Sequence, residues 1–570
     1  MDTFYKFVLL DLLATAMLSL QKKCYYCQPL NLPRRMERDM RKIGFVLAAL
    51  ICCLNISACQ NDEKSTAQAQ RTEMVYASTK DIRIINPHLY SGEMAAQSMV
   101  FEPLVVNTPE GVKPCLAESW EISPDGRVYT FHLRKGVTFT DGAPFDAAAV
   151  KLNMDAIVAN RQRHGFEMVN EIERNEVVDT YTYRLVLTHP YYPTLVELGL
   201  VRPFRIISPN CFINGQTKDG VSGYVGTGPW VLTEHKEKQY ALFTANKNYW
   251  GAQPRLQAVR WRVMPDHQTI MLALQKGEID LVYGADGDML NMDAFNALQK
   301  EGKYATLISK PIASRAILLN AHQPVTKDRA VRMALQYAVN KQAIVDGVLN
   351  GTESVADTLI SPTVPYCDLG LPVRGYDPGK AAAMLEAAGW KLGPDGLRAK
   401  DGQKAVVRLY YNSQNAQERT LAEYVQSDLK KVGIEMKIIG EEKQAFLDRQ
   451  RTGDFELQYS LSWGTPYDPQ SYLSSWRKPA HGDYQAQVGM ERKEWLDKTI
   501  SQLMIEPDEA TRKAMYREVL TYVHDEGVYI PISYSRTKAV HSKALQGVGF
   551  AVSQYEIPFE KMYFENTPAR

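Results

Sequence analysis

The repeated order of a helical segment followed by a strand-like segment constrains the fold of this chain most strongly. Residues 421–432 carry apolar side chains at helical spacing, Gly433 follows as a helix stop, and residues 434–438 alternate between apolar and polar side chains as in a strand. The same order recurs over residues 515–523 and 528–532. Helices that alternate with strands in this way predict an α/β architecture.

Two more helices are predicted in the second half of the chain. The spacing of apolar residues predicts one helix over residues 328–348, ending before Gly351. Another is predicted to begin at Pro378, because Asp377 is a good cap residue and Pro fits the first helical position. Gly389 is its expected end.

A hairpin is predicted in the first half of the chain. Residues 120–122 and 128–133 read as strands, and the second of them has an apolar side chain at every other position. The four residues 123–126 between them suit a type I turn, with Pro124 at the second position and Gly126 at the fourth.

The overall composition indicates a globular protein that does not bind nucleic acid. Hydrophobic residues make up 45% and charged residues 23% of the 570 residues, which allows a large packed core. Lys and Arg number 66 and Asp and Glu number 65, giving a formal net charge of +1. Without a basic excess, the chain lacks the electrostatic attraction that binding to a phosphate backbone requires.

The N-terminal region has the pattern of an export signal. Arg41 and Lys42 precede the apolar run 43–54, which is shorter than the ~20 residues that span a bilayer but suits the core of a signal peptide. The run ends in Ile-Ser-Ala-Cys, which resembles a bacterial lipobox and predicts lipidation of Cys59. Residues 1–58 are therefore expected to be an upstream extension plus a lipoprotein signal peptide, and residues 59–73 a polar tether.

The stretch ahead of the signal peptide is interpreted as an over-extended reading frame, with the start at Met36 or Met40. Cys24 and Cys27 lie in it and are assigned no function. The mature chain of 512 residues would carry 58 basic and 61 acidic side chains.

Metal binding by protein ligands alone is poorly supported by the sequence. Besides Cys59, only Cys115, Cys211 and Cys367 remain in the mature chain, and they are too far apart to indicate a zinc cluster or a disulfide framework. The 10 His residues form no close cluster. Nickel and copper ions prefer several nitrogen and oxygen donors, so a metal handled by this protein would have to bring most of its ligands in a small chelator.

Motifs of catalysis are also missing from the sequence. The glycine-rich run 226–230 lacks the Gly-Lys-Ser/Thr ending of a phosphate-binding loop, and no nucleophile elbow or His-Glu-x-x-His helix occurs. Glu278 and Asp280 lie at strand-like spacing and are interpreted as solvated carboxylates. An exported hydrolase is kept only as a remote alternative.

Several ordered runs resemble the peptide/nickel class of solute-binding proteins (family 5), which feed bacterial ABC importers. The resemblance covers residues 74–566 and rests on Phe-Glu-Pro-Leu (101–104), Leu-Ala-Glu-Ser-Trp (116–120), Asp-Gly-Ala-Pro-Phe (141–145), Gly-Thr-Gly-Pro-Trp (226–230), Asn-Tyr-Trp (248–250) and Gly-Glu-Ile-Asp (277–280). It implies an α/β, two-lobed periplasmic-binding-protein fold with an enlarged first lobe and a hinge. Residues 74–311 and 535–566 would form lobe I, and residues 312–534 lobe II.

Other runs are similar to the nickel-binding branch of this class, namely Asn-Pro-His-Leu-Tyr (86–90), Arg-Gln-Arg-His (161–164), Arg-Pro-Phe-Arg (202–205), Trp-Gly-Thr-Pro-Tyr-Asp-Pro (463–469) and His-Asp-Glu (524–526). The resemblance implies that His481 coordinates the metal directly and that Arg163 and Arg202 hold carboxylates of the chelator. It also implies that the cavity holding the cargo is lined by Met94, Phe166, Trp463, Tyr467 and Tyr555.

Two of these positions depart from the branch. Phe166 stands where the branch tends to have Trp, and Tyr555 where it has a smaller hydroxyl residue. Without the resemblance, the aromatic residues would be interpreted as ordinary core side chains and Arg163 as a surface charge.

The sequence therefore predicts a binding lipoprotein that is not an enzyme. It would capture a nickel chelate such as nickel-histidine outside the cytoplasm and deliver it to an ABC permease with its ATPase subunits. The nickel complex is cargo rather than a permanent cofactor, the membrane is reached only through the lipid anchor, and the protein is expected to be a monomer.

The alternative is a di- or oligopeptide receptor of the same fold. Peptide binders of the class usually place an Asp shortly after the Trp of the cleft loop, where it grips the peptide ammonium group. Here Pro466 and Tyr467 occupy that stretch, and Asp468 is interpreted as part of an Asp-Pro turn. A buried ammonium group without a carboxylate partner is costly, which counts against peptides.

Overall fold

The computed structural model describes residues 71–284, 290 and 292–565. The predicted lipidation site Cys59 and the predicted signal peptide lie outside the described residues, as do Cys24 and Cys27. Two large mixed sheets and several small ones, with helices packed on them, form the described chain. The predicted α/β class is confirmed.

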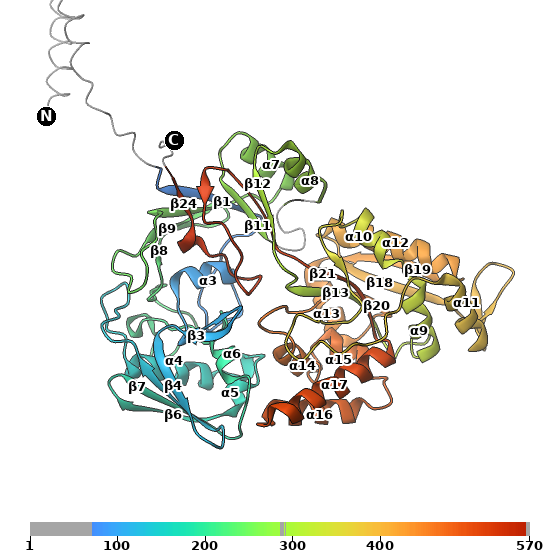
Figure 1. Ribbon diagram of the computed structural model, residues 1–570, viewed down its shortest axis with the longest axis horizontal. Coiled ribbons are helices and arrows are strands. Elements are labelled where there is room, and N and C mark those ends of the chain that lie inside the picture. Colours follow the sequence, from blue (N-terminus) through green and yellow to red (C-terminus); the bar gives the residue numbers. More distant parts are fainter. Residues whose placement is uncertain (1–70, 285–289, 291, 566–570) are drawn as a thin grey trace, which may run out of the picture. The chain divides into compact units, whose positions relative to one another are not determined.

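The first large sheet has seven strands in the order β12-β22-β11-β1-β10-β9-β8, drawn from distant parts of the chain (Figure 1). Its strands are β1 (Glu73–Ser78), β8 (Trp230–Lys236), β9 (Tyr240–Ala245), β10 (Ala258–Val263), β11 (Leu281–Gly284), β12 (Ala305–Ile308) and β22 (Lys538–His541). Strand β1 pairs in parallel with both β10 and β11. The buried faces of α3 (Met94–Val100), α7 (His267–Gln275) and α8 (Met292–Glu301) share one apolar core with this sheet.

The second large sheet has six strands in the order β14-β21-β13-β20-β18-β19. Its strands are β13 (Ala313–Leu319), β14 (Ser354–Val355), β18 (Val406–Asn412), β19 (Glu435–Glu441), β20 (Leu457–Leu461) and β21 (Tyr529–Ser535). Strand β13 lies in its middle and is buried at every position. The chain passes between the two large sheets over residues 309–312 and 536–537.

Nine helices belong to the part of the described chain between β13 and β21. They are α9 (Arg329–Ala338), α10 (Lys341–Gly347), α11 (Pro378–Ala387), α12 (Ala416–Lys431), α13 (Lys443–Thr452), α14 (Gln470–Ser475), α15 (Gly482–Gln487), α16 (Lys493–Ile505) and α17 (Glu509–Glu526). Apolar residues of α9 to α12 pack against the sheet in a second core cluster.

A four-stranded antiparallel sheet in the order β4-β5-β7-β6 completes the first half of the chain. Its strands are β4 (Ala117–Ile122), β5 (Val128–Leu133), β6 (Ile172–Asp179) and β7 (Thr182–Leu187), accompanied by α4 (Ala147–Ala159), α5 (Met168–Glu171) and α6 (Thr194–Leu198). The predicted hairpin is confirmed, because β4 and β5 pair antiparallel and the Gly126 N–H donates to the Ser123 carbonyl at 2.8 Å.

The remaining elements are short. They are β2 (Val105–Thr108), β3 (Gly111–Pro114), β15 (Lys391–Leu392), β16 (Arg398–Lys400), β17 (Gln403–Lys404), β23 (Leu545–Gln546), β24 (Tyr563–Phe564) and the 3₁₀ turns η2 (Arg161–Arg163), η3 (Pro209–Cys211) and η4 (Phe559–Lys561).

Local signals located most helix ends correctly. The Asp377 side chain accepts a hydrogen bond from the Lys380 N–H at 2.8 Å and so caps α11. Gly433 and Gly527 follow α12 and α17 with φ of 81° and 65°, a conformation that glycine adopts without strain. The strands predicted after these helices are β19 and β21.

The predicted single helix over 328–348 is wrong, because it is two helices, α9 and α10. Val339 is extended between them. Asn340 caps the second helix through its side chain, which accepts from the Ala343 N–H at 3.0 Å. Its own backbone N–H donates to Asp428 at 2.8 Å. A tertiary contact thus satisfies the chain where the helix breaks.

The interpretation of Asp280 as a solvated carboxylate is also wrong. Asp280 is fully buried, forms an ion pair with Arg71 and accepts a hydrogen bond from the Val75 N–H at 2.9 Å. Glu278 is exposed and pairs with Arg262 at 3.2 Å, as expected for a surface carboxylate. Cys115, Cys211 and Cys367 are free and buried in the described chain.

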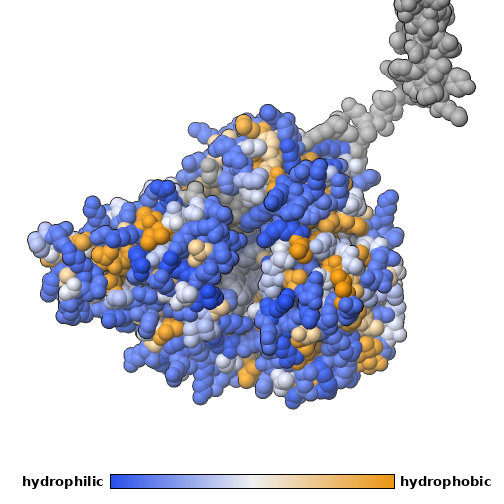
Figure 2. All heavy atoms as spheres, turned by 180° about the vertical axis from the view of Figure 1, so that it is seen from behind, coloured by the Kyte–Doolittle hydropathy of each residue, from blue (hydrophilic) through white to orange (hydrophobic). Residues whose placement is uncertain are grey.

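The surface is largely hydrophilic. Figure 2 shows one face on which apolar residues gather only in small, separate groups. The large apolar side chains that are exposed, such as Ile84 and Val373, are scattered along the chain. Among the described helices, none combines the length and apolar character needed to cross a membrane.

Candidate ligand-binding site

A cavity of about 390 Å³ brings the predicted site residues together. The described residues that line it are Tyr90, Met94, Arg163, Gly165, Phe166, Arg202, Trp463, Tyr467, His481 and Tyr555. They include all eight ligand-contacting residues that the sequence predicted, although their contact with a ligand stays a prediction. The volume suits a small molecule, whereas a cavity of about 30 Å³ beside Cys367 and His524 has room for little more than water.

These side chains come from loops and element ends that lie far apart in the sequence. Met94 is the first residue of α3, Arg163 ends η2, and Arg202 follows α6. Trp463 follows β20, and His481 is the cap residue of α15. Element ends suit a binding site, because a rigid scaffold holds side chains there without burying them in the core.

The aromatic residues pack on one another and form the walls of the cavity. The ring centroid of Phe166 lies 6.2 Å from those of both Trp463 and Tyr467. Tyr555 meets Tyr467 edge-on at 5.6 Å, and the Tyr467 hydroxyl lies 4.0 Å from the Met94 sulfur. Rings in mutual contact lose little entropy when a ligand binds, so the walls are largely pre-formed.

A tight turn places Trp463 and Tyr467 on the same cavity. The N–H groups of Tyr467 and Asp468 both donate to the Gly464 carbonyl, at 2.8 and 3.0 Å. Gly464 has a φ of 76°, and a Cβ there would lie 3.1 Å from the Ile312 carbonyl oxygen. The turn therefore requires glycine, because a side chain would be strained and crowded by the neighbouring strand.

Two guanidinium groups supply the positive charge of the cavity. Arg202 lies over the Tyr90 ring, 5.5 Å from its centroid, and Arg163 donates to the Lys218 carbonyl at 3.2 Å. Burial lowers the pKa of Arg202, but a guanidinium group stays protonated at neutral pH. Within the described part of the chain, neither Arg forms an ion pair with a carboxylate.

The imidazole of His481 is held beside the Trp463 ring, with 5.8 Å between the ring centroids. Burial lowers the pKa of His481, although Asp483 opposes the shift. The ring is consequently neutral at pH 7, which leaves one ring nitrogen with a lone pair for a metal ion.

Asp468 does not contribute a carboxylate to the cavity. It is buried and accepts a hydrogen bond from the Ser462 hydroxyl at 2.6 Å. Burial raises the pKa of Asp468 to about 7. The ten residues that line the cavity include no acidic side chain, so the described site offers nothing that would neutralise a peptide ammonium group.

Sequence reasoning missed Tyr90 and Gly165 as lining residues. The Tyr90 ring packs against the Arg202 guanidinium group, and its hydroxyl accepts a hydrogen bond from the Gly165 N–H at 3.2 Å. Both lie in or next to runs that resemble the nickel-binding branch, at residues 86–90 and 161–164. That proximity was the available signal.

Protein side chains alone do not form a metal centre in the described residues. No three His, Cys, Asp or Glu side chains converge there in an arrangement that could hold a metal ion. The cavity offers one neutral imidazole beside two guanidinium groups, a donor set that fits a metal only when the metal arrives with anionic ligands of its own.

The α/β fold with two large sheets and the ligand-sized cavity lined from distant segments fit a solute-binding protein. The family model described as bacterial extracellular solute-binding proteins, family 5 Middle, matches residues 111–484. The chain belongs to this family, whose members are two-lobed binding proteins and not enzymes.

Two curated relatives and one crystal structure illustrate the relationship. The "Nickel-binding periplasmic protein" of Escherichia coli K12 is 42% identical over 523 residues, covering 90% of this chain and 98% of the relative. The "Dipeptide-binding protein" of the same organism is 29% identical over 542 residues, covering 88% and 95%. The crystal structure of NikA from Brucella suis in complex with Fe(III)-EDTA is 44% identical, covers 86% of this chain and all of that chain, and superposes with a TM-score of 0.85.

Proposed function

We propose that this protein captures a nickel ion held by a small carboxylate-bearing chelator, outside the cytoplasm, and delivers it to an ABC importer. The observation that carries the proposal is the pairing, in one cavity, of two guanidinium groups free of acidic partners among the described residues with one neutral imidazole. The protein would bind its cargo without changing it chemically.

The charge of the cavity favours an anionic cargo. Arg163 and Arg202 bring two positive charges, and the lining residues bring no negative one. A guanidinium group can donate two parallel hydrogen bonds to a carboxylate, which makes Arg better suited to this task than Lys. In a cavity with aromatic walls these bonds are stronger than at an exposed surface. The expected cargo therefore carries at least one carboxylate near each Arg.

The imidazole of His481 favours a metal within that cargo. A neutral ring nitrogen is a good ligand for nickel, and one protein ligand is sufficient when a chelator fills the other positions. The relatives support this assignment, since one is named for binding nickel and another was crystallised with iron held by EDTA, an organic molecule with several carboxylates.

The remaining parts of the proposal follow from the sequence. Cys59 would carry the lipid anchor, and an ABC permease with its ATPase subunits would receive the cargo from a monomeric binding protein that holds no permanent cofactor. We further propose 74–311 with 535–566 as lobe I and 312–534 as lobe II, a division supported by the two chain crossings between the large sheets.

Calorimetry tests the proposal directly. Purified protein comprising residues 60–570 is titrated with Ni²⁺ alone, with Ni²⁺ and histidine, and with a set of dipeptides. Tight binding is expected only for nickel with the chelator, because His481 alone cannot complete the coordination of the metal. Tight binding of dipeptides together with indifference to nickel would replace the proposal with the peptide receptor.

Replacement of His481 by alanine is expected to weaken binding of nickel with histidine by at least about tenfold, because loss of even an indirect metal contact typically has that effect. Thermal stability should stay nearly unchanged, since the His481 side chain makes no capping hydrogen bond and its ring packs beside the Trp463 ring at the cavity. Parallel calorimetry and thermal denaturation check both points. A large loss of stability would mark His481 as a structural residue.

A further inference from the structure

Polar contacts join two segments that lie close in sequence to residues lining the cavity. One segment is 165–167, which begins two residues after Arg163, and the other is 474–478, which ends three residues before His481. The Arg477 guanidinium donates to Oε2 of Glu167, and the Ser474 hydroxyl donates to the same oxygen at 3.4 Å. The Lys478 ammonium group donates to the backbone carbonyl of Gly165. Under the proposed boundaries these contacts connect lobe I with lobe II.

The ion pair in this set is shielded and well supported. The side chain of Arg477 is 14% exposed and that of Glu167 is 24% exposed. Arg477 also donates to the Ser501 hydroxyl in α16 at 2.7 Å. Glu167 is the cap residue of α5, yet its side chain makes no capping hydrogen bond and is directed to Arg477 instead. A partly buried pair held at both ends contributes more than an exposed one.

A short turn connects this ion pair with His481. The His481 N–H donates to the Lys478 carbonyl at 3.0 Å, which closes a turn with Pro479 at its second position. The Gln485 side chain donates to the Pro479 carbonyl at 2.8 Å, and its backbone N–H donates to the His481 carbonyl at 3.2 Å. Because the turn is held internally, the position of Lys478 constrains the position of the His481 backbone, from which the imidazole extends.

We propose that Glu167, Arg477 and Lys478 form a clasp that positions His481 opposite the segment bearing Arg163 and Phe166, and so sets the affinity for the metal chelate. This inference rests on the proposed function. The three are positioning residues, since none of them is among the described residues that line the cavity. The clasp thereby fixes the position of His481, the proposed metal ligand in lobe II, relative to Arg163, the proposed carboxylate-binding residue in lobe I.

The clasp is tested with Glu167→Gln, Arg477→Gln and the double variant, by calorimetry with nickel and histidine. Each single change is expected to raise the dissociation constant about tenfold, and the double variant about as much as either single one, because the two residues form one coupled pair. The swapped pair Glu167→Arg with Arg477→Glu is expected to recover most of the affinity. Single changes that leave the dissociation constant within twofold, or that add up in the double variant, overturn the inference.

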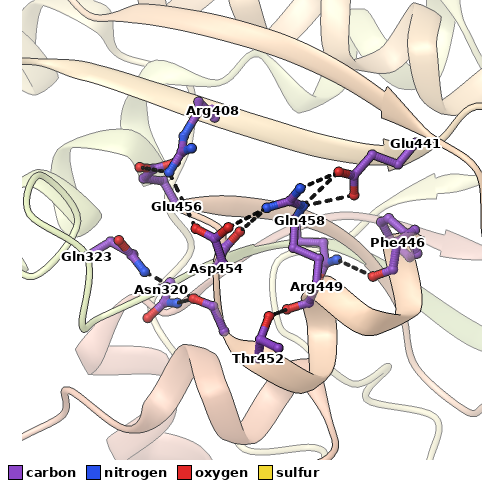
Figure 3. A network of polar contacts seen from close by, with 11 residues as sticks. Asn320, Gln323, Arg408, Glu441, Phe446, Arg449, Thr452, Asp454, Glu456 and Gln458 are labelled. Carbon is purple, nitrogen blue, oxygen red and sulfur yellow. Dashed lines mark hydrogen bonds and ion pairs between the residues drawn. The ribbon is translucent and has the colours of Figure 1, made fainter. Parts of the chain in front are cut away.

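A matched control ion pair lies in the same proposed lobe as Arg477. Glu441 pairs with Arg449 in the polar network of Figure 3, with 12% and 22% of the two side chains exposed. Arg449 also bonds to Asp454 in that network, whose labelled residues include none of the three clasp residues. Glu441→Gln therefore removes an ion pair of similar shielding and leaves Glu167, Arg477 and Lys478 unchanged, and we expect it to change the dissociation constant less than twofold.

Hydrogen–deuterium exchange in the free protein separates the clasp from the cargo assignment. Amide groups of residues 478–487 should exchange at least several-fold faster in Glu167→Gln and Arg477→Gln than in the parent protein or in Glu441→Gln, because the turn loses its anchor. If exchange changes as expected and nickel with histidine does not bind the parent protein, the proposed function fails while the clasp stands. If the parent protein binds and neither exchange nor affinity changes, the clasp fails.

The absorption spectrum of bound nickel, which reports its ligands, should also shift in the clasp variants and not in the control.

Discussion

Replacing Arg202 with alanine is expected to weaken binding of nickel with histidine by about 30- to 4,000-fold, because removal of one partner of a desolvated charge pair costs about 2–5 kcal/mol. The carboxylate of the cargo would enter the cavity and find no guanidinium group there. Among the described residues, Arg202 makes a 3.5 Å contact with the Ser91 carbonyl and a ring contact with Tyr90 but no ion pair, so folding stability should change little. Calorimetry and thermal denaturation of the variant measure both quantities.

Two further variants sharpen this test. Arg202→Lys keeps the charge and loses the planar pair of donors, so its dissociation constant should lie between those of the parent and the alanine variant. Arg184→Ala removes an Arg of the four-stranded sheet that pairs with Glu176 at 3.5 Å and should leave binding unchanged. Equal loss of affinity in the Arg184 and Arg202 variants would point to a general charge effect and contradict the assigned role.

Replacing Glu197 with glutamine is expected to change the pH dependence of folding stability. Glu197 is fully buried, and its Oε1 accepts hydrogen bonds from the Tyr191 hydroxyl at 2.9 Å and the Ser471 hydroxyl at 3.1 Å. Burial raises its pKa from 4.5 to about 7, and the nearby carboxylate of Glu167 acts in the same direction. The folded protein therefore keeps a proton on Glu197 at pH values where the unfolded chain has released it.

The sign of the effect follows from this difference. Between pH 4.5 and pH 7 the folded state binds more protons than the unfolded state, so this group makes the free energy of unfolding fall as the pH rises. The full loss is on the order of 3 kcal/mol, from about 1.4 kcal/mol for each pKa unit. Glutamine keeps the acceptor oxygen and cannot ionise, so the variant should resemble the parent at pH 5 and be more stable at pH 8.

Urea denaturation at pH 5 and pH 8 measures this prediction. Glu278→Gln serves as the control, since Glu278 is an exposed carboxylate paired with Arg262. A stability difference for Glu197→Gln that is the same at both pH values would show that Glu197 does not titrate as inferred. The result also bears on the cavity, because Ser471 lies in α14 directly after the turn that carries Tyr467.

The sequence predicted much of the secondary structure, and all eight residues that it assigned to the site line the cavity. Asp377, Gly433 and Gly527 act on residues within one turn of themselves, so the signal and its effect are both local. The break at Asn340 was not predictable in this way. It depends on Asp428, a residue of another helix, which accepts the Asn340 N–H.

The eight assigned residues that line the cavity could be predicted from the sequence for a different reason. Arg163, Arg202, Trp463 and Tyr467 lie in runs of several residues that resemble the nickel-binding branch, and the surrounding residues carried their assignment. The other four, Met94, Phe166, His481 and Tyr555, were assigned only as positions that the resemblance implies. Lone charged residues such as Glu167, Arg477 and Glu197 have no such context, and nothing in their neighbours distinguishes them from solvated surface charges.

The sequence by itself therefore determined the α/β class, the family and the composition of the site, because periodicity, helix caps and motif runs are written in adjacent residues. The tertiary structure alone decided which charges are buried and paired. Arg71 meets Asp280 across 209 positions, and Ser471 meets Glu197 across 274. A buried charge is tolerated only beside a suitable partner, and that partner is brought close by the fold from a distant part of the sequence. A pattern of neighbouring residues therefore does not predict it.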